Sequence, residues 1–198
     1  MLISNYSGQN FEAGCDEAGR GCLAGPVVAA AVIFPKNYSN DLINDSKQMS
    51  SAKRAVLRRV IEKDALCFAI GVVEPEIIDR INILQASILA MHRALDKLST
   101  EPEFIIVDGN KFKPWKAIEH ETFVKGDGRF LSIAAASILA KTFRDDLMSN
   151  LHGDFPVYQW NRNMGYPTKV HREAIRKHGI CIHHRKSFNM SNQLTINF

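Results

Sequence analysis

Short apolar runs that are typical of β-strands recur along most of the chain. They are the segments 11–16 (FEAGCD), 27–34 (VVAAAVIF), 65–73 (ALCFAIGVV), 103–108 (EFIIVD) and 121–125 (ETFVK). Runs of this length, bounded by glycine or polar residues, favour strands over helices. The pattern therefore predicts a sheet with a strand at each of these segments.

Helical periodicity occupies the intervals between these strands. Apolar residues recur at spacings of three and four in two series, which are Leu84, Ile88, Met91, Leu95 and Leu98, and then Leu139, Phe143, Leu147 and Leu151. A final helix is predicted from Thr168 to Lys177, because a capping threonine begins it and Gly179 follows it. Strands that cluster first and then alternate with helices predict a mixed α/β sheet flanked by helices.

The balance of charge changes near residues 150–159. Residues 1–159 contain 18 Lys and Arg against 20 Asp and Glu, whereas residues 160–198 contain 7 against 1. Basic groups attract a phosphate backbone, and aromatic residues among them can stack on sugars or bases. We therefore expect a main domain over 1–150 and a basic, helical segment with a tail over 151–198 that contacts a polyanion.

A second basic stripe falls on a predicted helix between residues 50 and 64. It consists of Lys53, Arg54, Arg58, Arg59 and Lys63, and the apolar residues Val56, Leu57, Val60 and Ile61 are expected to face the other way. We interpret this stripe as a solvated helix face, which is the usual role of a short run of charge.

No segment is typical of a membrane or a secreted protein. The first fourteen residues lack a basic run followed by an apolar stretch, and eighteen consecutive apolar residues occur nowhere. The four cysteines lack the paired spacing of a zinc site, and Cys181, His183 and His184 lack a second pair of ligands. We expect a cytoplasmic protein with free thiols, and a monomer.

Carboxylates follow three of the predicted strands, each next to a glycine. Asp16 and Glu17 follow FEAGC, Asp108 ends IIVD, and Asp127 lies in FVKGDG. Strand ends that share one edge of a sheet would concentrate negative charge, which favours a bound cation. Oxygen ligands without histidine or thiolate select Mg²⁺ or Mn²⁺. For both members of the adjacent pair to reach one metal cluster, the strand should end there.

The glycines of the segment 14–21 (GCDEAGRG) permit two interpretations. The spacing imitates a phosphate-binding loop, but Arg20 replaces the required lysine and Gly21 replaces the hydroxyl residue. We therefore favour the other interpretation, in which Gly19 and Gly21 let the chain turn and let a ligand approach the main chain.

Together these motifs resemble ribonuclease HII, the bacterial type 2 ribonuclease H. They are DEAGRG (16–21), DSK (45–47), VDGN (107–110), KGD (125–127), SIAAASILAKTFRD (132–145), GYPT (165–168) and HHRKSF (183–188), in the family's order. The resemblance implies a ribonuclease H-like fold, with a central mixed five-stranded sheet, helices on both sides and a small C-terminal helical part. It implies an endonuclease that cuts RNA in RNA/DNA hybrids and incises at single ribonucleotides in DNA.

The resemblance also assigns roles to individual residues. Asp16, Glu17, Asp108 and Asp127 would bind two Mg²⁺ or Mn²⁺ ions, and Asp145 would be a supporting residue. Substrate contacts are implied for Gly19, Arg20, Gly21, Ser46, Lys47, Tyr166, Lys169 and Arg172. The first three would contact the 2′-hydroxyl, and Tyr166 would pack on the sugar that follows the cut. A module that binds hybrids without cutting, or another ribonuclease H-like metal nuclease, is the alternative.

The C-terminal segment Gln193–Phe198 (QLTINF) suggests a partner. It resembles the Q-L-x-L-x-F peptides with which bacterial replication proteins bind the sliding clamp, with Ile196 at the second apolar position. Such a peptide would insert its apolar side chains into a groove of the partner.

Overall fold

A computed structural model of the chain describes residues 2–44 and 49–190. The described strands form a single five-stranded sheet in the order β3-β2-β1-β4-β5. Their bounds are β1 Glu12–Ala18, β2 Val27–Ile33, β3 Cys67–Val73, β4 Phe104–Asp108 and β5 His120–Phe123. β1, β2 and β3 pair in antiparallel fashion, whereas β4 lies parallel to both β1 and β5. The predicted mixed sheet and its strands are confirmed.

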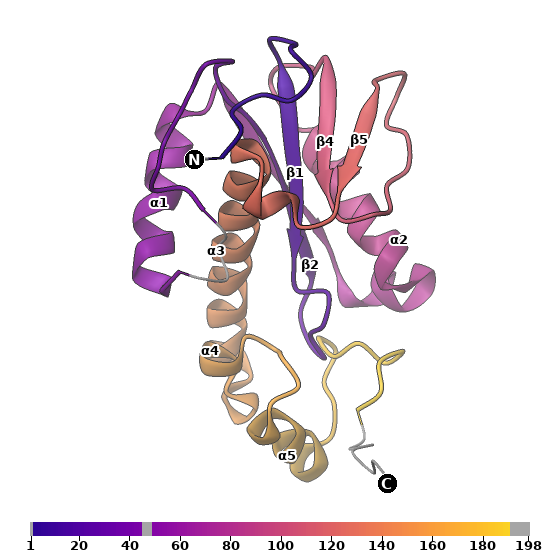
Figure 1. Cartoon of the computed structure of the whole chain (residues 1–198). Helices are drawn as coiled ribbons and strands as arrows, with labels where there is room; N and C mark the ends of the chain where they lie inside the picture. The colour runs from indigo at the N-terminus through magenta and orange to yellow at the C-terminus, as the bar shows by residue number, and fades with distance from the viewer. Residues whose placement is uncertain (1, 45–48, 191–198) are drawn as a thin grey trace, which may run out of the picture.

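Helices cover both faces of the sheet (Figure 1). α2 (Pro75–Leu95) packs on one face, where it forms a hydrophobic cluster with alternate residues of β1 and β2. α1 (Ser51–Asp64) and α3 (Leu131–Asp154) pack on the other face. Both faces of β2 are therefore covered, which explains why all of its residues in VVAAAVI are apolar and buried.

α3 lies directly against β1. A Cβ atom on Gly14 of β1 would come within 2.4 Å of the backbone carbon of Ser132 in α3, so only glycine permits this approach. The inward face of α3 differs from the predicted apolar series, because Phe143 and Leu147 are half-buried while Arg144 and Met148 are fully buried. The helix therefore carries a buried cation that the hydrophobic pattern did not indicate.

The face of α1 also differs from its prediction. Leu57 and Ile61 are buried, but Val56 is 63% exposed. Arg58 is half-buried, forms ion pairs with Glu62 and Asp146, and lies over the ring of Phe143. The interpretation of the basic stripe as a solvated face is wrong for this residue, because α1 packs against α3 there. It is also wrong for Arg54, which is half-buried and donates a hydrogen bond to the Met49 carbonyl.

The C-terminal part consists of η3 (Pro156–Tyr158), α4 (Trp160–Asn163), α5 (Lys169–His178) and a segment that returns to the β1–β2 connection (Figure 1). The predicted last helix is confirmed, with Thr168 as its N-cap. One hydrophobic cluster contains Trp160 and Ile175 together with Leu23, Ala24 and Met148. The C-terminal part is therefore packed against the main sheet-and-helix part; the boundary at residue 150 stays a prediction. No helix in the described ranges could span a membrane.

Candidate active site

The ends of β1 and β4 bring two carboxylates to the same face of the sheet. The two strands pair in parallel up to Cys15 and Val107, so Asp16 and Asp108 follow the last pair side by side. The Asp16 carboxylate accepts a hydrogen bond from Ser137 of α3, and the Asp108 carboxylate accepts one at 2.7 Å from the N–H of Gly126, shortly before α3 in the chain. A parallel strand pair that ends at one level thus concentrates acidic groups beside α3.

The sequence predicts that β1 ends at Asp16 and Glu17, but the strand ends there only on the side of β4. Asp16 and Glu17 still pair with Ala30 and Ala29 of β2, and β1 continues to Ala18. The expectation that the strand ends at the pair is correct only for the pairing with β4. Because β1 is free of β4 from Asp16 onward, both carboxylates can line the space beyond β4 while β2 keeps their backbone rigid.

The Asp16 carboxyl lies in an environment that disfavours its charge. It is 4% exposed, and burial, followed by the nearby charges of Glu17 and Asp108, raises its pKa well above the ordinary value. Hydrogen bonds from Ser137 and from the Glu17 N–H act in the opposite direction. A cation held among these groups would remove the repulsion.

A groove of about 390 Å³ contains three of the four predicted carboxylates. Its lining residues are Asp16, Glu17, Ala18, Gly19, Arg20, Gly21, Arg54, Asp108, Ser137, Lys141 and Tyr166. The structure therefore brings the carboxylates, the glycine loop and the predicted sugar-contacting tyrosine to one surface, although Tyr166 is 150 residues from Asp16 in sequence.

Asp127 lies beside this groove rather than in its lining. It is 4% exposed and belongs to η2 (Gly126–Gly128), which follows a left-handed residue, Lys125. The hydrogen bond from Gly126 to the Asp108 carboxylate fixes η2 next to the carboxylate cluster. Asp127, the fourth predicted ligand, therefore directly follows a residue whose backbone N–H binds the Asp108 carboxylate.

The glycine loop presents its backbone to the groove. Arg20 donates a hydrogen bond to the Glu17 carboxylate at 3.1 Å, and its side chain is 48% exposed. A Cβ atom on Gly21 would meet no atom within 4 Å, so this backbone is open to a ligand. Gly19, by contrast, is buried with φ +96°, a conformation that side chains disfavour.

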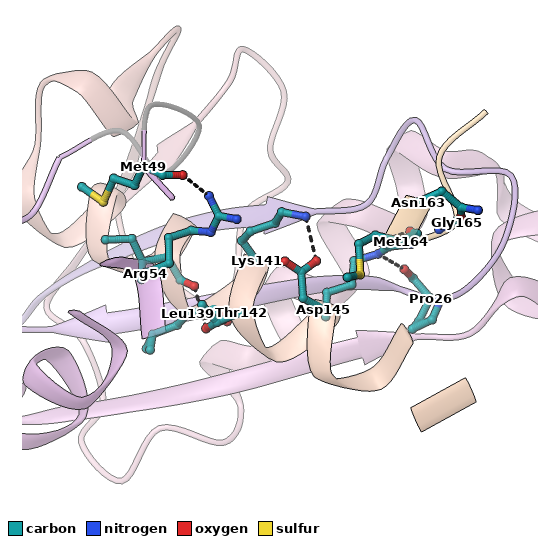
Figure 2. Close-up of polar contacts among 12 residues, drawn as sticks. Pro26, Met49, Arg54, Leu139, Lys141, Thr142, Asp145, Asn163, Met164 and Gly165 are labelled. Carbon is teal, nitrogen blue, oxygen red and sulfur yellow. Dashed lines mark hydrogen bonds and ion pairs between the residues drawn. The ribbon is translucent and has the colours of Figure 1, made fainter. Parts of the chain in front are cut away.

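Two basic residues and Tyr166 form the opposite side of the groove. The Lys141 ammonium lies 5.5 Å from the centre of the Tyr166 ring, and it forms an ion pair with Asp145 at 2.7 Å (Figure 2). Asp145 therefore contacts the groove through Lys141, and its supporting role stays a prediction. Arg54 donates a hydrogen bond to the Met49 carbonyl at 2.5 Å on the same side (Figure 2).

The remaining predicted contacts lie farther away or outside the described residues. Lys169 begins α5 with a side chain that is 87% exposed, and Arg172 donates hydrogen bonds to the backbone carbonyls of Pro167 and Met190. Neither lines the groove. Ser46, Lys47 and the segment Gln193–Phe198 lie outside the described residues.

Sequence reasoning missed five residues that contact the site. They are Cys22, Arg54, Ser137, Lys141 and Arg144. Three of them lie in the motif 132–145, but the amino-acid types in that motif do not indicate which side chains face the strands. The helical spacing of four between Ser137 and Lys141, in register with Asp145, was the available signal.

The carboxylates fit a divalent cation in their chemistry. All four are oxygen donors, and the lining of the groove that contains three of them includes no thiolate or imidazole, which matches Mg²⁺ or Mn²⁺. Burial, followed by the charges of Glu17 and Asp108, raises the pKa of Asp16, so a cation beside this carboxylate would favour its charged form. Within residues 2–44 and 49–190, no three His, Cys, Asp or Glu side chains are arranged as a ready-made metal site.

The sheet order, the helices on both faces and acidic residues at the ends of β1 and β4 define a ribonuclease H-like fold. Solved structures with the same fold include ribonuclease H2 from Pyrococcus horikoshii OT3, with TM-score 0.75, 24% identity and coverage of 91% of this chain and 94% of that chain. Bst-RNase HIII in complex with Mn²⁺ matches with TM-score 0.72 and 19% identity, over 91% and 67% of the two chains.

Sequence comparisons identify the family. The family model for ribonuclease HII matches residues 13–191. Ribonuclease HII from Bacteroides thetaiotaomicron is 58% identical over 200 residues, and that from Parabacteroides distasonis is 59% identical over 199, each covering 100% of both chains. The chain belongs to the ribonuclease HII family, and it is a ribonuclease H enzyme. The resemblance seen in the motifs is confirmed.

Proposed function

We propose that this chain is a divalent-metal-dependent endonuclease that cuts the RNA strand of RNA/DNA hybrids and incises 5′ to single ribonucleotides embedded in duplex DNA. The products would be a 3′-hydroxyl and a 5′-phosphate. The observation that carries the proposal is the meeting of the carboxylates, the glycine loop and Tyr166 in one groove. An RNA-selective nuclease needs both a charged centre and a contact with the 2′-hydroxyl.

The proposed metal ligands are Asp16, Glu17, Asp108 and Asp127. When bound there, Mg²⁺ or Mn²⁺ would activate water and neutralise the charge that develops on the phosphate and the leaving 3′ oxygen. The protein's own part is to hold the carboxylates in place, because β2 fixes the backbone of β1 and Gly126 orients Asp108. Ser137 would hold the Asp16 carboxylate toward the groove.

The sugar contacts are proposed for the two sides of the groove. The backbone at Gly21 and its neighbour Arg20 would contact the 2′-hydroxyl of the ribonucleotide, since Gly21 has no Cβ atom to keep the sugar away. The Tyr166 ring, 38% exposed, would pack on the deoxyribose beyond the cut. Lys141, next to that ring, would attract the phosphate between these two sugars.

Contacts farther along the duplex are proposed for the basic helix α5. Lys169, Arg172, Arg176 and Lys177 give it a strongly positive surface against a single acid, Glu173. Ser46 and Lys47 are proposed as further phosphate contacts, on the resemblance alone. The proposed substrates would lie in chromosomal DNA, which agrees with the cytoplasmic location expected from the sequence.

The segment Gln193–Phe198 is proposed to bind a sliding clamp. The motif resemblance supports this, and a solved structure similar in fold is described as the PCNA:RNase HII complex from Archaeoglobus fulgidus, with TM-score 0.74, 24% identity and coverage of 95% and 100%. The test is to delete Gln193–Phe198 and measure clamp binding and nuclease activity separately. The proposal requires that clamp binding is lost while incision of a free duplex is kept.

The direct test of the enzymatic proposal is cleavage of a duplex that carries one ribonucleotide. Incision with Mg²⁺ or Mn²⁺ immediately 5′ to that nucleotide, and none on an all-DNA duplex, is the expected result. A protein that binds the duplex and leaves it intact under all metal conditions would instead be the hybrid-binding module.

A further inference from the structure

The two sides of the groove that would contact the sugars are joined by a buried arginine. Arg144 of α3 is 0% exposed and donates three hydrogen bonds, each to a backbone carbonyl. Its Nε donates to Pro26 at 3.0 Å, one terminal nitrogen to Ala24 at 3.0 Å, and the other to Met164 at 2.8 Å. Figure 2 shows Met164 and Pro26 close together, next to Asn163 and Gly165. One guanidinium therefore connects the 19–26 loop to the 163–166 loop.

Arg144 also contacts one further residue in each of these loops, Tyr166 and Gly19. Its guanidinium carbon lies 5.9 Å from the centre of the Tyr166 ring. A Cβ atom on Gly19 would lie 2.1 Å from its Nε atom, so Gly19 packs directly on the arginine. The Leu23 N–H donates to the Gly165 carbonyl at 2.8 Å, which ties the loops together beside the arginine.

A second buried arginine holds the other side of the glycine loop. Arg185 is 0% exposed and donates to the Arg20 carbonyl at 3.0 Å and to the Gly25 carbonyl at 3.0 Å. Its remaining terminal nitrogen is buried without a hydrogen-bond partner among the described residues. Burial lowers the pKa of Arg185 to about 10, so the fold disfavours this charge yet retains the side chain.

The geometry of these bonds requires the guanidinium group. A buried charge is costly, and apolar side chains can often replace it without loss of stability. A planar fork with donors in fixed directions can, however, hold three carbonyls of two loops at set distances, which a lysine ammonium on a flexible stem cannot. The arginines are therefore better explained by the positions that they impose than by the stability that they add.

We propose that Arg144 and Arg185 are positioning residues that set the distance between the glycine loop Gly19–Gly21 and Tyr166, and thereby the enzyme's selection for a ribonucleotide followed by a deoxyribonucleotide. The inference rests on the proposed function, which assigns the two sugar contacts to these loops. Neither arginine touches the substrate or the carboxylates in this role. Each acts through the backbone that it binds.

The test compares Arg144→Lys, Tyr166→Ala and the double variant on two substrates. Activity is measured as kcat and KM on a duplex with one ribonucleotide and on a uniform RNA/DNA hybrid. Because a misplaced contact costs between about tenfold and a hundredfold in rate, Arg144→Lys should lower kcat/KM on the first substrate by that factor and on the hybrid by clearly less. In the Tyr166→Ala background, the same change should cost little more, since coupled residues are not additive.

The matched control is Arg93→Lys. Arg93 is half-buried on α2 and also donates to a backbone carbonyl, that of Val72, but on the face of the sheet away from the groove. It should alter the melting temperature without altering the preference between the substrates. Equal losses on both substrates for Arg144→Lys would show that Arg144 serves stability only, and so would full additivity with a Tyr166→Ala variant that itself shifts the preference. If Arg144→Lys does not fold, Arg185→Lys carries the same test.

The outcome also separates this inference from the proposed function. If Tyr166→Ala leaves the preference unchanged while Arg144→Lys shifts it, the role given to Tyr166 is wrong and the positioning of the glycine loop is upheld. If Tyr166→Ala shifts the preference and neither arginine variant does, the positioning role is wrong and the sugar contact stands. If none of the variants shifts the preference, both assignments are wrong.

Discussion

The carboxylates of the groove and its proposed sugar contacts are held in place by different kinds of hydrogen bond. Asp16, Glu17 and Asp108 lie on strands whose backbone is fixed by ladder hydrogen bonds within a buried sheet. The glycine loop and Tyr166 lie on irregular segments that are fixed by side chains, chiefly Arg144 and Arg185, which donate to backbone carbonyls. Rigid elements suit a site that must hold cations, whereas side-chain bonds allow the distance between two loops to be tuned.

The largest expected effect is at the carboxylate end. Asp16→Asn or Asp108→Asn should lower cleavage of every substrate by about a thousandfold or more, since several kcal/mol of charge stabilisation is lost. Duplex binding should remain, and thermal unfolding should occur at an unchanged or higher temperature, because the substitution removes a crowded charge.

Asp154→Asn, at the exposed end of α3, serves as the control for this experiment and should cleave normally. Near-normal turnover by either site variant, measured at saturating Mg²⁺, would contradict the assignment of the carboxylates.

A smaller and selective effect is expected at the other end. Tyr166→Ala should reduce incision at a single ribonucleotide by about tenfold, which corresponds to the low end of the roughly 1–3 kcal/mol that an aromatic ring contributes when it stacks on a base. Cleavage within a uniform hybrid should fall less, because no deoxyribose follows the cut there. Tyr166→Phe keeps the ring and should behave like the unmodified protein; a large loss in that variant would assign the effect to the hydroxyl instead.

The contribution of α5 should appear in the salt dependence of binding. Replacing Lys169, Arg172 and Arg176 by glutamine should flatten the slope of log K against log salt by about 0.9 for each phosphate contact removed. Lys97→Gln, on the α2 side, should leave the slope unchanged. If the triple variant keeps the full slope on duplex substrates, α5 presents only a solvated surface.

An effect on stability, and not on cleavage, concerns pH and the C-terminal part. His184 is buried and accepts hydrogen bonds at Nδ1 from the Cys181 N–H, and desolvation lowers its pKa from 6.5 to about 4. Above pH 6.5 it is neutral both folded and unfolded. As the pH falls from 6.5 toward 4, only the unfolded chain gains the proton, so the free energy of unfolding should drop by at most about 1.4 kcal/mol per pH unit.

This pH dependence is measured by denaturant unfolding between pH 7 and 4.5. His184→Gln should show a shallower decline than the unmodified protein, and His178→Gln, at the exposed end of α5, should show the same decline. Identical slopes in all three proteins would mean that His184 is not held neutral by the fold.

The regular elements were predictable from sequence, and the irregular contacts were not. Apolar runs located each strand, and acids at strand ends located Asp16 and Asp108, because both signals depend on local periodicity. The errors concern packing between elements: Val56 is exposed, Arg58 packs between α1 and α3, and Arg144 is buried where the pattern of α3 indicated Phe143 and Leu147. The hydrogen bond from the Arg144 side chain to the Met164 carbonyl joins two residues whose contact no periodic pattern in the sequence indicates.

The central claim is that the groove couples cation-dependent cleavage to recognition of a ribose. It is tested most directly with a duplex that contains one ribonucleotide, beside an identical all-DNA duplex, with Mg²⁺ and with a chelator. The expected result is a single nick 5′ to the ribonucleotide, with a 3′-hydroxyl end, only when metal is present. Cleavage of the all-DNA duplex at a similar rate, or undiminished cleavage in chelator, would contradict the claim.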